Sequence, residues 1–381
     1  MEKDNRGERV ALVVGVTGIV GLSLAELLVG TTTNEGHPGW RVYGVARRPR
    51  ASWFKPDIAT YLQCDLLNRD QTLATLSPLA DITHLFFTTW TNRGKEEANV
   101  EANSTMLRNT LDALLSHATG LRHVSLLTGT KHYLGSFDTL LAPTSAFTRT
   151  PQLRMFHEDE PRLSGPNFYY SQEDILLAAA VASSGRLTWN VHRSATIIGV
   201  SPIALVNVAF FLASYALMCK EEGVPFRFPG DRISWESHTE FTDTYLIAEQ
   251  QIWAATHHVA HNQAFNVSNG DVAPWTSLWP AIASFFDLEV PAYTGEPVRL
   301  ADAMQGKAHV WETIVSRYKL HPTPWESICV GWSGLDLSLL SLPPYRISME
   351  KSSKLGFRGY RDSTTCLLNA FRELRKMGII P

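Results

Sequence analysis

The first half of the chain alternates short apolar, β-branched segments with longer segments of helical periodicity. Helical patterns separate the apolar segments, most clearly at Asn99–His117. Strands that alternate with helices of this length indicate a parallel sheet with helices on both faces. We therefore expect an α/β fold built on a doubly wound parallel sheet. The predicted strands are Val10–Val14, Arg41–Ala46, Tyr61–Cys64, Thr83–Thr88 and His123–Leu127.

The pattern changes near residue 200, where tryptophans and prolines become frequent and helical periodicity dominates. Thr188–Ile198 and Ala264–Val267 are predicted as later strands of the same sheet, and 135–166 as a long polar loop. We expect residues 1–200, with the strand near 264–269, to form one domain. Residues 201–381 then form a smaller, mostly helical substrate lobe with an interleaved boundary. Its clearest helices are predicted at Trp275–Phe286, Ala301–Tyr318 and Ser363–Met377.

Ile197–Met218 is the one stretch apolar enough to raise the question of a membrane span. The uninterrupted part after Pro202 is about 16 residues long, whereas a bilayer requires roughly 20. Ser201-Pro202 is typical of a helix start. We therefore predict a buried helix here and no membrane span.

Composition and charge exclude several classes of protein. Of the 381 residues 44% are apolar and 19% charged, and the formal net charge is −3. A mildly acidic chain without a Lys/Arg run is a poor nucleic-acid binder, because such binding depends on phosphate neutralisation. The four cysteines form no Cys-x-x-Cys pair, which argues against a disulfide framework or a structural zinc site. With the polar, charged segment Met1–Arg9 in place of an export signal, we expect a cytoplasmic protein.

A glycine motif follows the first predicted strand and opens the first helix. Gly15, Gly18 and Gly21 have the spacing G-x-x-G-x-x-G. Glycines at such a turn let a pyrophosphate approach the backbone, and the helix N-terminus offers N–H groups to its oxygens. A plain structural turn is the alternative, but the strand–turn–helix context favours a Rossmann-type dinucleotide site.

The end of the second strand predicts which dinucleotide binds. NAD sites place an acid there to hold the ribose 2′-hydroxyl, but the nearest acid, Glu35, lies in the loop before the strand. Arg47, Arg48 and Arg50 stand at the end of the strand instead. Guanidinium groups match a 2′-phosphate, so we expect NADP(H); a solvated basic loop is the alternative.

Polar residues after the third and fourth strands complete the expected cofactor site. Asp65 is placed to meet the adenine, and Thr89 and Trp90 to meet a ribose, although each alone could be a turn residue. No metal is expected. The run His157–Glu160 has no spaced partner and is interpreted as a solvated acidic turn.

The usual catalytic pair of short-chain dehydrogenases is absent, because no tyrosine has a lysine four residues later. Other candidates follow the fifth strand and open a later helix. They are the segments Thr128–Tyr133 (TGTKHY) and Asn167–Tyr170 (NFYY).

With these segments the chain resembles the progesterone 5β-reductase/iridoid synthase family over nearly its whole length. That family comprises atypical extended short-chain dehydrogenases that reduce the C=C bond of activated enones with NADPH. The segments that carry the resemblance are Gly15–Gly21, Val45–Pro49, Thr128–Tyr133, Asn167–Tyr170 with Glu173-Asp174, His192-Arg193 and Ala264–Asp271.

The resemblance implies residue roles. Lys131 matches the catalytic lysine and Tyr169 the catalytic tyrosine, and both are expected to contact cofactor and substrate. Ser194 departs from the family, which commonly has proline after His-Arg. Leu127 and Ala204 also depart, so we expect any contacts of theirs to be made through the backbone. The implied cofactor contacts are Thr17, Gly18, Ile19, Arg47, Arg48, Asp65, Leu66, Thr89, Leu127, Ile197 and the segment around Ala204.

The implied reaction is a 1,4-reduction of a small apolar enone or enal. Tyr169 would donate a hydrogen bond to the enolate oxygen, where charge develops. Lys131 would lower the pKa of Tyr169 and help to hold the nicotinamide ribose. Phe137 is expected to line the apolar substrate pocket. Tyr133 and Tyr170 are interpreted as packing residues, with Tyr170 a backup for Tyr169, and His132 and His192 as hydrogen-bonded core residues.

Two alternatives remain open. One is a carbonyl reductase or epimerase of the same superfamily, which the missing Tyr-x-x-x-Lys disfavours. The other is a regulator that senses NADP(H) without turnover, which has no need of Lys131 and Tyr169. A homodimer is also left open by the sequence.

Overall fold

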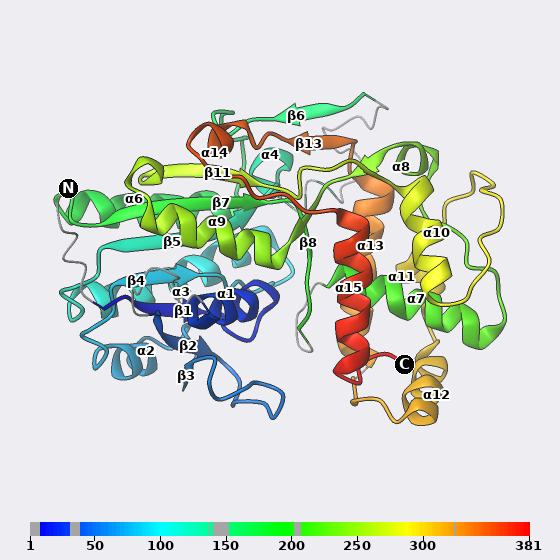
Figure 1. Cartoon of the computed structure of the whole chain (residues 1–381), viewed down its shortest axis with the longest axis horizontal. Coiled ribbons are helices and arrows are strands. Elements are labelled where there is room, and N and C mark those ends of the chain that lie inside the picture. Colours follow the sequence, from blue (N-terminus) through cyan, green and yellow to red (C-terminus); the bar gives the residue numbers. More distant parts are fainter. Residues whose placement is uncertain are drawn as a thin grey trace.

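The computed structural model describes residues 8–30, 39–136, 138, 140, 152–201, 207–323 and 325–381. Its central feature is a sheet of seven strands in the order β11-β7-β5-β4-β1-β2-β3, in which every neighbouring pair is parallel (Figure 1). This is the doubly wound Rossmann topology predicted from the sequence. The strands are β1 (Val10–Val14), β2 (Arg41–Ala46), β3 (Thr60–Gln63), β4 (His84–Phe87), β5 (His123–Gly129), β7 (Thr188–Ser194) and β11 (Gln263–Val267).

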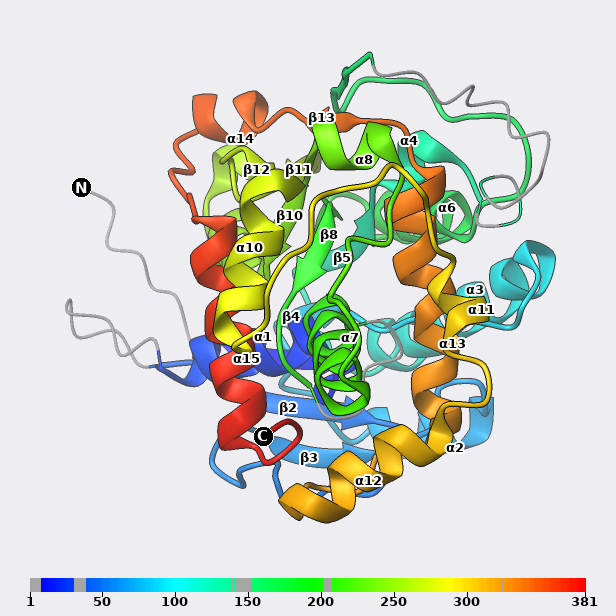
Figure 2. The same cartoon turned by 90° about the vertical axis from the view of Figure 1, so that its right-hand side faces the viewer.

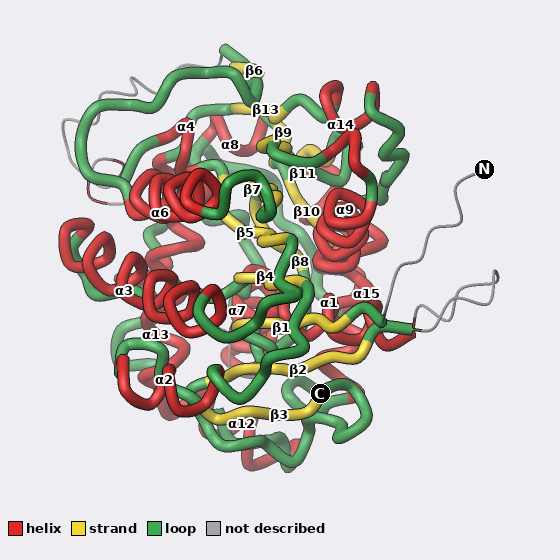
Figure 3. The backbone as a smooth tube through the Cα atoms, turned by 90° about the vertical axis from the view of Figure 1, so that its left-hand side faces the viewer, coloured by secondary structure: helices red, strands yellow, loops and turns green. Residues whose placement is uncertain are grey.

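Helices cover both faces of this sheet, as Figure 3 shows end-on. On one face lie α1 (Ile19–Gly30) and α9 (Thr244–Thr256). On the other lie α2 (Arg69–Leu76), α3 (Glu96–Leu115) and α6 (Phe168–Ala182).

The residues of β1 divide between these two faces. Leu12 and Val14 belong to the apolar cluster that includes Leu107 of α3. Ala11 and Val13 belong to the cluster that includes Leu24 of α1. All five residues of β1 are therefore buried, which is why the strand appears in the sequence as a continuous apolar run.

The predicted strand Thr188–Ile198 is divided in the structure. β7 ends at Ser194, and β8 (Thr196–Ile198) leaves the main sheet to pair with β10 (Phe241–Asp243). The Ala195 N–H between them donates to Thr242 Oγ1 at 3.0 Å, which turns the chain towards β10. No glycine or proline stands between residues 188 and 198, so the sequence does not mark this break.

Most helices that follow residue 200 lie together beside the main sheet (Figure 2). They pack around their own apolar cluster, in which Trp279, Trp311 and Trp332 are fully buried. These tryptophans are therefore core residues. The division into two domains near residue 200 stays a prediction. The helices of this part are α7 (Val208–Glu222), α8 (Arg232–Glu236), α10 (Trp275–Phe285), α11 (Leu300–Ala303), α12 (Ala308–Tyr318), α13 (Trp325–Asp336) and α15 (Ser363–Lys376).

The helix predicted from Ser201-Pro202 begins later than expected, at Val208. Its N-cap is Asn207, whose Oδ1 accepts a hydrogen bond from the Phe210 N–H at 3.1 Å. This side chain supplies the capping oxygen, so the helix start is set there. No helix among the described residues is long and apolar enough to cross a bilayer.

The predicted helix Ala301–Tyr318 is also two helices. Gly306, with φ +72°, interrupts it, and α12 starts again at Ala308. A left-handed residue ends a helical segment, and glycine adopts that conformation without steric cost.

The long loop 135–166 contains a short strand that the sequence did not predict. β6 (Arg154–Phe156) pairs in parallel with β13 (Tyr345–Ile347), and Phe156 stacks on Tyr133 with ring centroids 4.9 Å apart. A three-residue strand carries no alternation of its own, so only its partner reveals it. The remaining elements are α4 (Lys131–Leu134), β9 (His238–Thr239), β12 (Ala273–Pro274), α14 (Glu350–Lys354) and the short helical turns His258–Ala260 and Leu337–Ser341.

Candidate active site

The glycine turn between β1 and α1 has the close packing that a dinucleotide site requires. Gly15 adopts φ +90°, and a Cβ on Gly21 would lie only 2.1 Å from the Gly15 carbonyl oxygen. The Gly18 N–H donates to the same oxygen at 2.8 Å. The turn is thus folded against the start of α1, whose first N–H groups lack intrahelical acceptors and suit phosphate oxygens.

The segment after β8 packs against this turn. Ser201 Oγ donates to the Thr17 carbonyl oxygen at 2.7 Å, and a Cβ on Gly199 would meet Ile19 Cγ2 at 2.2 Å. Thr89, after β4, also borders the turn, because a Cβ on Gly15 would lie 2.9 Å from Thr89 Cβ. Three segments that are distant in sequence therefore surround the place predicted for the pyrophosphate.

Arg47 and Arg48 follow β2 at the same edge of the sheet, and both side chains are exposed. Their backbone is held by β3: Tyr61 Oη donates to the Arg48 carbonyl oxygen at 2.7 Å, and Gln63 Nε2 to that of Arg47 at 3.4 Å. Asp65 lies just past β3, where its Oδ1 accepts from the Leu67 N–H at 3.1 Å. The contacts of Arg47 and Arg48 with a 2′-phosphate and of Asp65 with the adenine stay predictions.

The other predicted cofactor residues are distributed as follows. Leu66 is buried, and Leu127 and Ile197 pack on the apolar cluster that contains Val20 of α1. Trp90 stacks on Phe168, the first residue of α6, with ring centroids 5.9 Å apart. Ala204 and Phe137 lie outside the described residues.

Lys131 and Tyr169 come together at the carboxyl end of β5. Lys131 opens α4 directly after that strand and is 5% exposed. Its Nζ lies 3.9 Å from the centre of the Phe168 ring and 5.2 Å from that of Tyr169. A Cβ on Gly129, the last residue of β5, would lie 3.3 Å from Tyr169 Oη. The ammonium and the phenol therefore share one site although 38 residues of sequence separate them.

Asn167 joins the two segments. Its Oδ1 caps α6 by accepting from the Tyr169 N–H at 3.1 Å, and its Nδ2 donates to the Lys131 carbonyl oxygen at 3.0 Å. The first turn of α6 is thereby held against α4.

Glu96 is a site residue that the sequence reasoning missed. It begins α3, is 1% exposed, and forms an ion pair with Lys131. In the sequence it appears only as an acid in the first turn of a helix, which is a common position with no specific meaning. Burial lowers the pKa of Lys131 to about 8, and the hydrogen bond and charge of Glu96 oppose that decrease.

The pKa of Tyr169 differs from the expectation. Burial, and then the negative charge of Glu96, raise the pKa of this phenol well above its ordinary value. The expected decrease is wrong because burial, and after it the carboxylate of Glu96, favour the neutral phenol, and the sequence argument contained neither. Tyr169 is therefore a neutral phenol at physiological pH and a hydrogen-bond donor.

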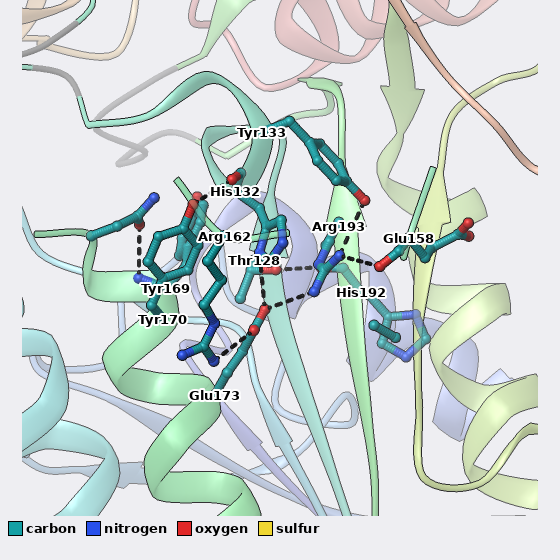
Figure 4. A network of polar contacts seen from close by, with 12 residues as sticks. Thr128, His132, Tyr133, Glu158, Arg162, Tyr169, Tyr170, Glu173, His192 and Arg193 are labelled. Atoms are coloured by element: carbon teal, nitrogen blue, oxygen red, sulfur yellow. Dashed lines mark hydrogen bonds and ion pairs between the residues drawn. The ribbon is translucent and has the colours of Figure 1, made fainter. Parts of the chain in front are cut away.

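A buried polar network lies behind the pair (Figure 4). Its centre is Glu173 of α6, which accepts from Arg193 of β7 at 3.3 Å and from Arg162 at 3.1 Å, and lies 3.4 Å from His132 Nδ1. Burial opposes ionisation of Glu173, but contacts with His132, Arg193 and Arg162 outweigh it and lower its pKa. The network ties together the loop after β5, the helix that carries Tyr169 and strand β7.

Tyr133, Tyr170 and His192 have hydrogen-bond partners, as predicted. Within the described residues, by contrast, the ring nitrogens of the buried His132 form no hydrogen bond, and His132 contacts Glu173 only as an ion pair. Tyr133 Oη donates to Asn266 Oδ1 at 2.6 Å, and His192 Nδ1 lies 2.9 Å from Gln250 Oε1. Tyr170 Oη donates to the His132 carbonyl oxygen at 2.6 Å. Because its hydroxyl is already engaged there, Tyr170 does not fit the predicted backup role.

Comparisons with known proteins identify the family of the chain. A family model described as the PRISE-like Rossmann-fold domain matches residues 11–381. The (S)-8-oxocitronellyl enol synthase of Nepeta cataria and the 3-oxo-Delta(4,5)-steroid 5-beta-reductase of Arabidopsis thaliana are each 44% identical over 375 residues. Each alignment covers 98% of this chain and 94% of the relative.

Solved structures share the fold. The Bordetella bronchiseptica enzyme WbmH in complex with NAD+ matches with a TM-score of 0.61 at 14% identity, over 98% of this chain and 100% of that one. A UDP-glucose 4-epimerase from Thermotoga maritima matches with a TM-score of 0.61 at 13% identity, over 96% and 99%. The family model and the two curated relatives together show that the chain belongs to the family of PRISE-like Rossmann-fold proteins.

Proposed function

We propose that this protein reduces the C=C bond of activated enones or enals with NADPH. The observation that carries the proposal is the convergence of the Tyr169 phenol and the Lys131 ammonium at the carboxyl end of β5. Ligands of doubly wound sheets bind at that edge. The chain is an oxidoreductase, and its Arabidopsis relative is a reductase by name.

The chemistry follows from the charge that a 1,4-reduction creates. Bound NADPH supplies the hydride that adds to the β-carbon of the enone. Negative charge then develops on the carbonyl oxygen, and a neutral Tyr169 stabilises it by donating a hydrogen bond. The α-carbon is protonated afterwards, by solvent or by Tyr169.

Lys131 contributes a positive charge to the same site. Its ammonium stabilises the developing enolate electrostatically and is placed to hold the nicotinamide ribose. Both effects require the protonated amine, so activity should decline as the pH rises through the pKa of Lys131, which is about 8.

The preference for NADPH over NADH rests on Arg47 and Arg48. Their side chains are exposed at the end of β2, where a ribose 2′-phosphate would lie. The solved neighbours named above contain NAD+ or UDP-glucose, but at 13–14% identity they carry information on the fold alone.

Oxidation of NADPH at 340 nm tests the proposal with a cyclic enone, an enal, a steroid enone and a saturated ketone. We expect turnover of enones or enals and none of the ketone. Consumption with the ketone alone selects the carbonyl reductase alternative. Binding of NADPH without any turnover selects the regulator.

Tyr169→Phe tests the role of the phenol. Loss of an oxyanion donor typically decreases the rate about a hundredfold or more, so kcat should fall by that factor while the NADPH dissociation constant changes less than about twofold. Tyr360→Phe is the matched control, because Tyr360 is 59% exposed. Full activity of Tyr169→Phe contradicts the proposed role.

The names of the two relatives suggest two substrate classes to compare. They are named for a steroid reductase and for an oxocitronellyl enol synthase, and each is 44% identical to this chain. Ratios of kcat/KM for a steroid enone and for a linear dialdehyde decide between these classes. The cytoplasmic location and the homodimer stay predictions, and light scattering after gel filtration tests the second.

A further inference from the structure

Glu96 occupies a place where an unpaired carboxylate would be strongly disfavoured. Its side chain is 1% exposed, and the side chain of its partner Lys131 is 4% exposed. An isolated buried ion is costly, so buried charges occur with partners. The ion pair lies directly beneath the ring of Phe168, which the ammonium faces at 3.9 Å.

The Glu96 carboxylate contacts both segments that form the proposed catalytic pair. Its Oε1 accepts a hydrogen bond from Lys131 Nζ of α4. The same oxygen accepts a second hydrogen bond, at 2.8 Å, from the Phe168 N–H in the first turn of α6. Its Oε2 lies 3.4 Å from Asn99 Nδ2 one turn further along α3. One carboxylate on a third helix therefore connects the residue after β5 to the residue that precedes Tyr169.

The backbone of Glu96 is fixed as well. Its N–H donates to Asp138 Oδ2 at 2.9 Å, so the residue is held at the start of α3 from the side of α4. The charges that face the Lys131 ammonium are thus Glu96 from α3 and Asp138 from the segment after α4, and the phenol of Tyr169 faces it from α6.

We propose that Glu96 is a positioning residue that keeps Lys131 protonated inside the buried site and holds it against the helix that carries Tyr169. Glu96 touches neither substrate nor cofactor in this scheme and acts through Lys131 and through the Phe168 N–H. The inference rests on the proposed function, because it assigns Glu96 a part in that reaction.

Removal of the carboxylate charge has a specific consequence. Glu96→Gln keeps an oxygen that can accept from Lys131 and Phe168 but leaves the ammonium without its opposite charge. An opposite charge at such a distance favours the ionised form by about one to two pKa units, so Lys131 should lose its proton at a correspondingly lower pH. A defect in folding alone would not move a pH profile.

The test is the pH dependence of kcat for wild type, Glu96→Gln and Glu97→Gln. Glu97 is the matched control, because it lies in the same first turn of α3 but is exposed. We expect the alkaline limb of Glu96→Gln to move to lower pH by about one to two units, with a loss of about fivefold or more at pH 8. At pH 6 its kcat should return to within about twofold of wild type, since Lys131 is charged again.

The outcomes decide the inference. An alkaline limb of Glu96→Gln at the wild-type position overturns it, as does an equal shift for Glu97→Gln. Glu96→Asp keeps the charge but withdraws it from the Lys131 ammonium, because the side chain is one methylene shorter, so its limb should move to lower pH by a smaller amount than that of Glu96→Gln. If Glu96→Gln does not fold, Glu96→Asp decides: a small acidward shift supports the inference and an unmoved limb overturns it.

A second readout separates this inference from the proposed function. The dissociation constant of NADPH, followed by quenching of tryptophan fluorescence without any enone, should weaken along the same limb and shift in the same way in Glu96→Gln. If wild type reduces no enone, the proposed function fails, and this binding profile still shows whether Glu96 controls the charge of Lys131. A binding profile identical in wild type and Glu96→Gln counts against the inference.

Discussion

Substitution of Gly21 by alanine tests whether the tight glycine turn forms the nucleotide site. A Cβ at this position would lie 2.1 Å from the Gly15 carbonyl oxygen and 2.7 Å from its carbon, whereas real contacts essentially never fall below 3.0 Å. Both close atoms belong to the backbone, so no side chain can rotate away. The start of α1 and the turn must therefore separate by roughly an ångström.

The energetic result combines two opposed effects. Overpacking of this kind typically costs about 1–3 kcal/mol. Alanine in a helix interior is favoured over glycine by about 0.5–1 kcal/mol, which offsets part of that loss. We expect Gly21→Ala to reduce the free energy of unfolding by about 1–2 kcal/mol, as measured by urea denaturation.

The effect on NADPH should exceed the effect on stability. Displacing the turn misplaces N–H groups that are expected to bind phosphate, and a hydrogen bond to a charged group contributes about 1.5–3 kcal/mol. The dissociation constant of NADPH should therefore rise about tenfold or more, as measured by fluorescence titration.

Gly30→Ala is the matched control. Gly30 ends the same helix α1, is exposed, and a Cβ there would meet nothing within 4 Å. This variant should be as stable as wild type or slightly more stable, with unchanged NADPH binding. The reasoning is refuted if Gly21→Ala is as stable as wild type and binds NADPH equally well.

Three further predictions concern the polar core and the cofactor. Glu173→Gln leaves the buried Arg193 without its charge partner and should lower the free energy of unfolding, measured by urea denaturation, by about 3–5 kcal/mol. The control is Asp174→Asn, which changes a carboxylate that is 63% exposed and should alter the free energy of unfolding by less than about 1 kcal/mol. Burial lowers the pKa of His84 to about 3 and that of His192 to about 4. Both side chains therefore bind protons more weakly in the folded state than in the unfolded state, where their pKa is about 6.5. Their contribution to the free energy of unfolding is present above about pH 6.5 and should be lost as the pH falls towards 4 and 3. His84→Gln removes one such group and should flatten the pH dependence of the free energy of unfolding between pH 7 and pH 5. The control is His258→Gln, at an exposed position, which should leave this dependence unchanged. An unaltered slope in His84→Gln contradicts the assignment. The double variant Arg47→Ala/Arg48→Ala should raise the dissociation constant of NADPH about tenfold or more and leave that of NADH unchanged. The control is Lys55→Ala, at an exposed position. Equal losses of affinity for NADPH and NADH would exclude a 2′-phosphate site.

Much of the main sheet could be predicted because parallel strands buried on both faces leave a continuous apolar signal. Val10–Val14 and Arg41–Ala46 match β1 and β2 residue for residue. The break at Ala195 between β7 and β8 was missed because no glycine or proline marks the change of partner there. The three-residue strand β6 was missed because its only signal is β13, nearly 190 residues later.

In the candidate site, too, local patterns were predictable and contacts between distant segments were not. The glycine spacing, the arginines after the second strand, and the two segments that hold Lys131 and Tyr169 are local patterns, so the sequence by itself determined them. Only the tertiary structure decided that Glu96 joins them, because the start of α3 reaches α4 and α6 through packing and not through any spacing in the chain. The charge states follow from that packing. Burial and the Glu96 carboxylate together set the pKa of Lys131 near 8 and keep Tyr169 protonated. The residues next to Lys131 and Tyr169 in the sequence indicate neither the burial nor the nearby charge.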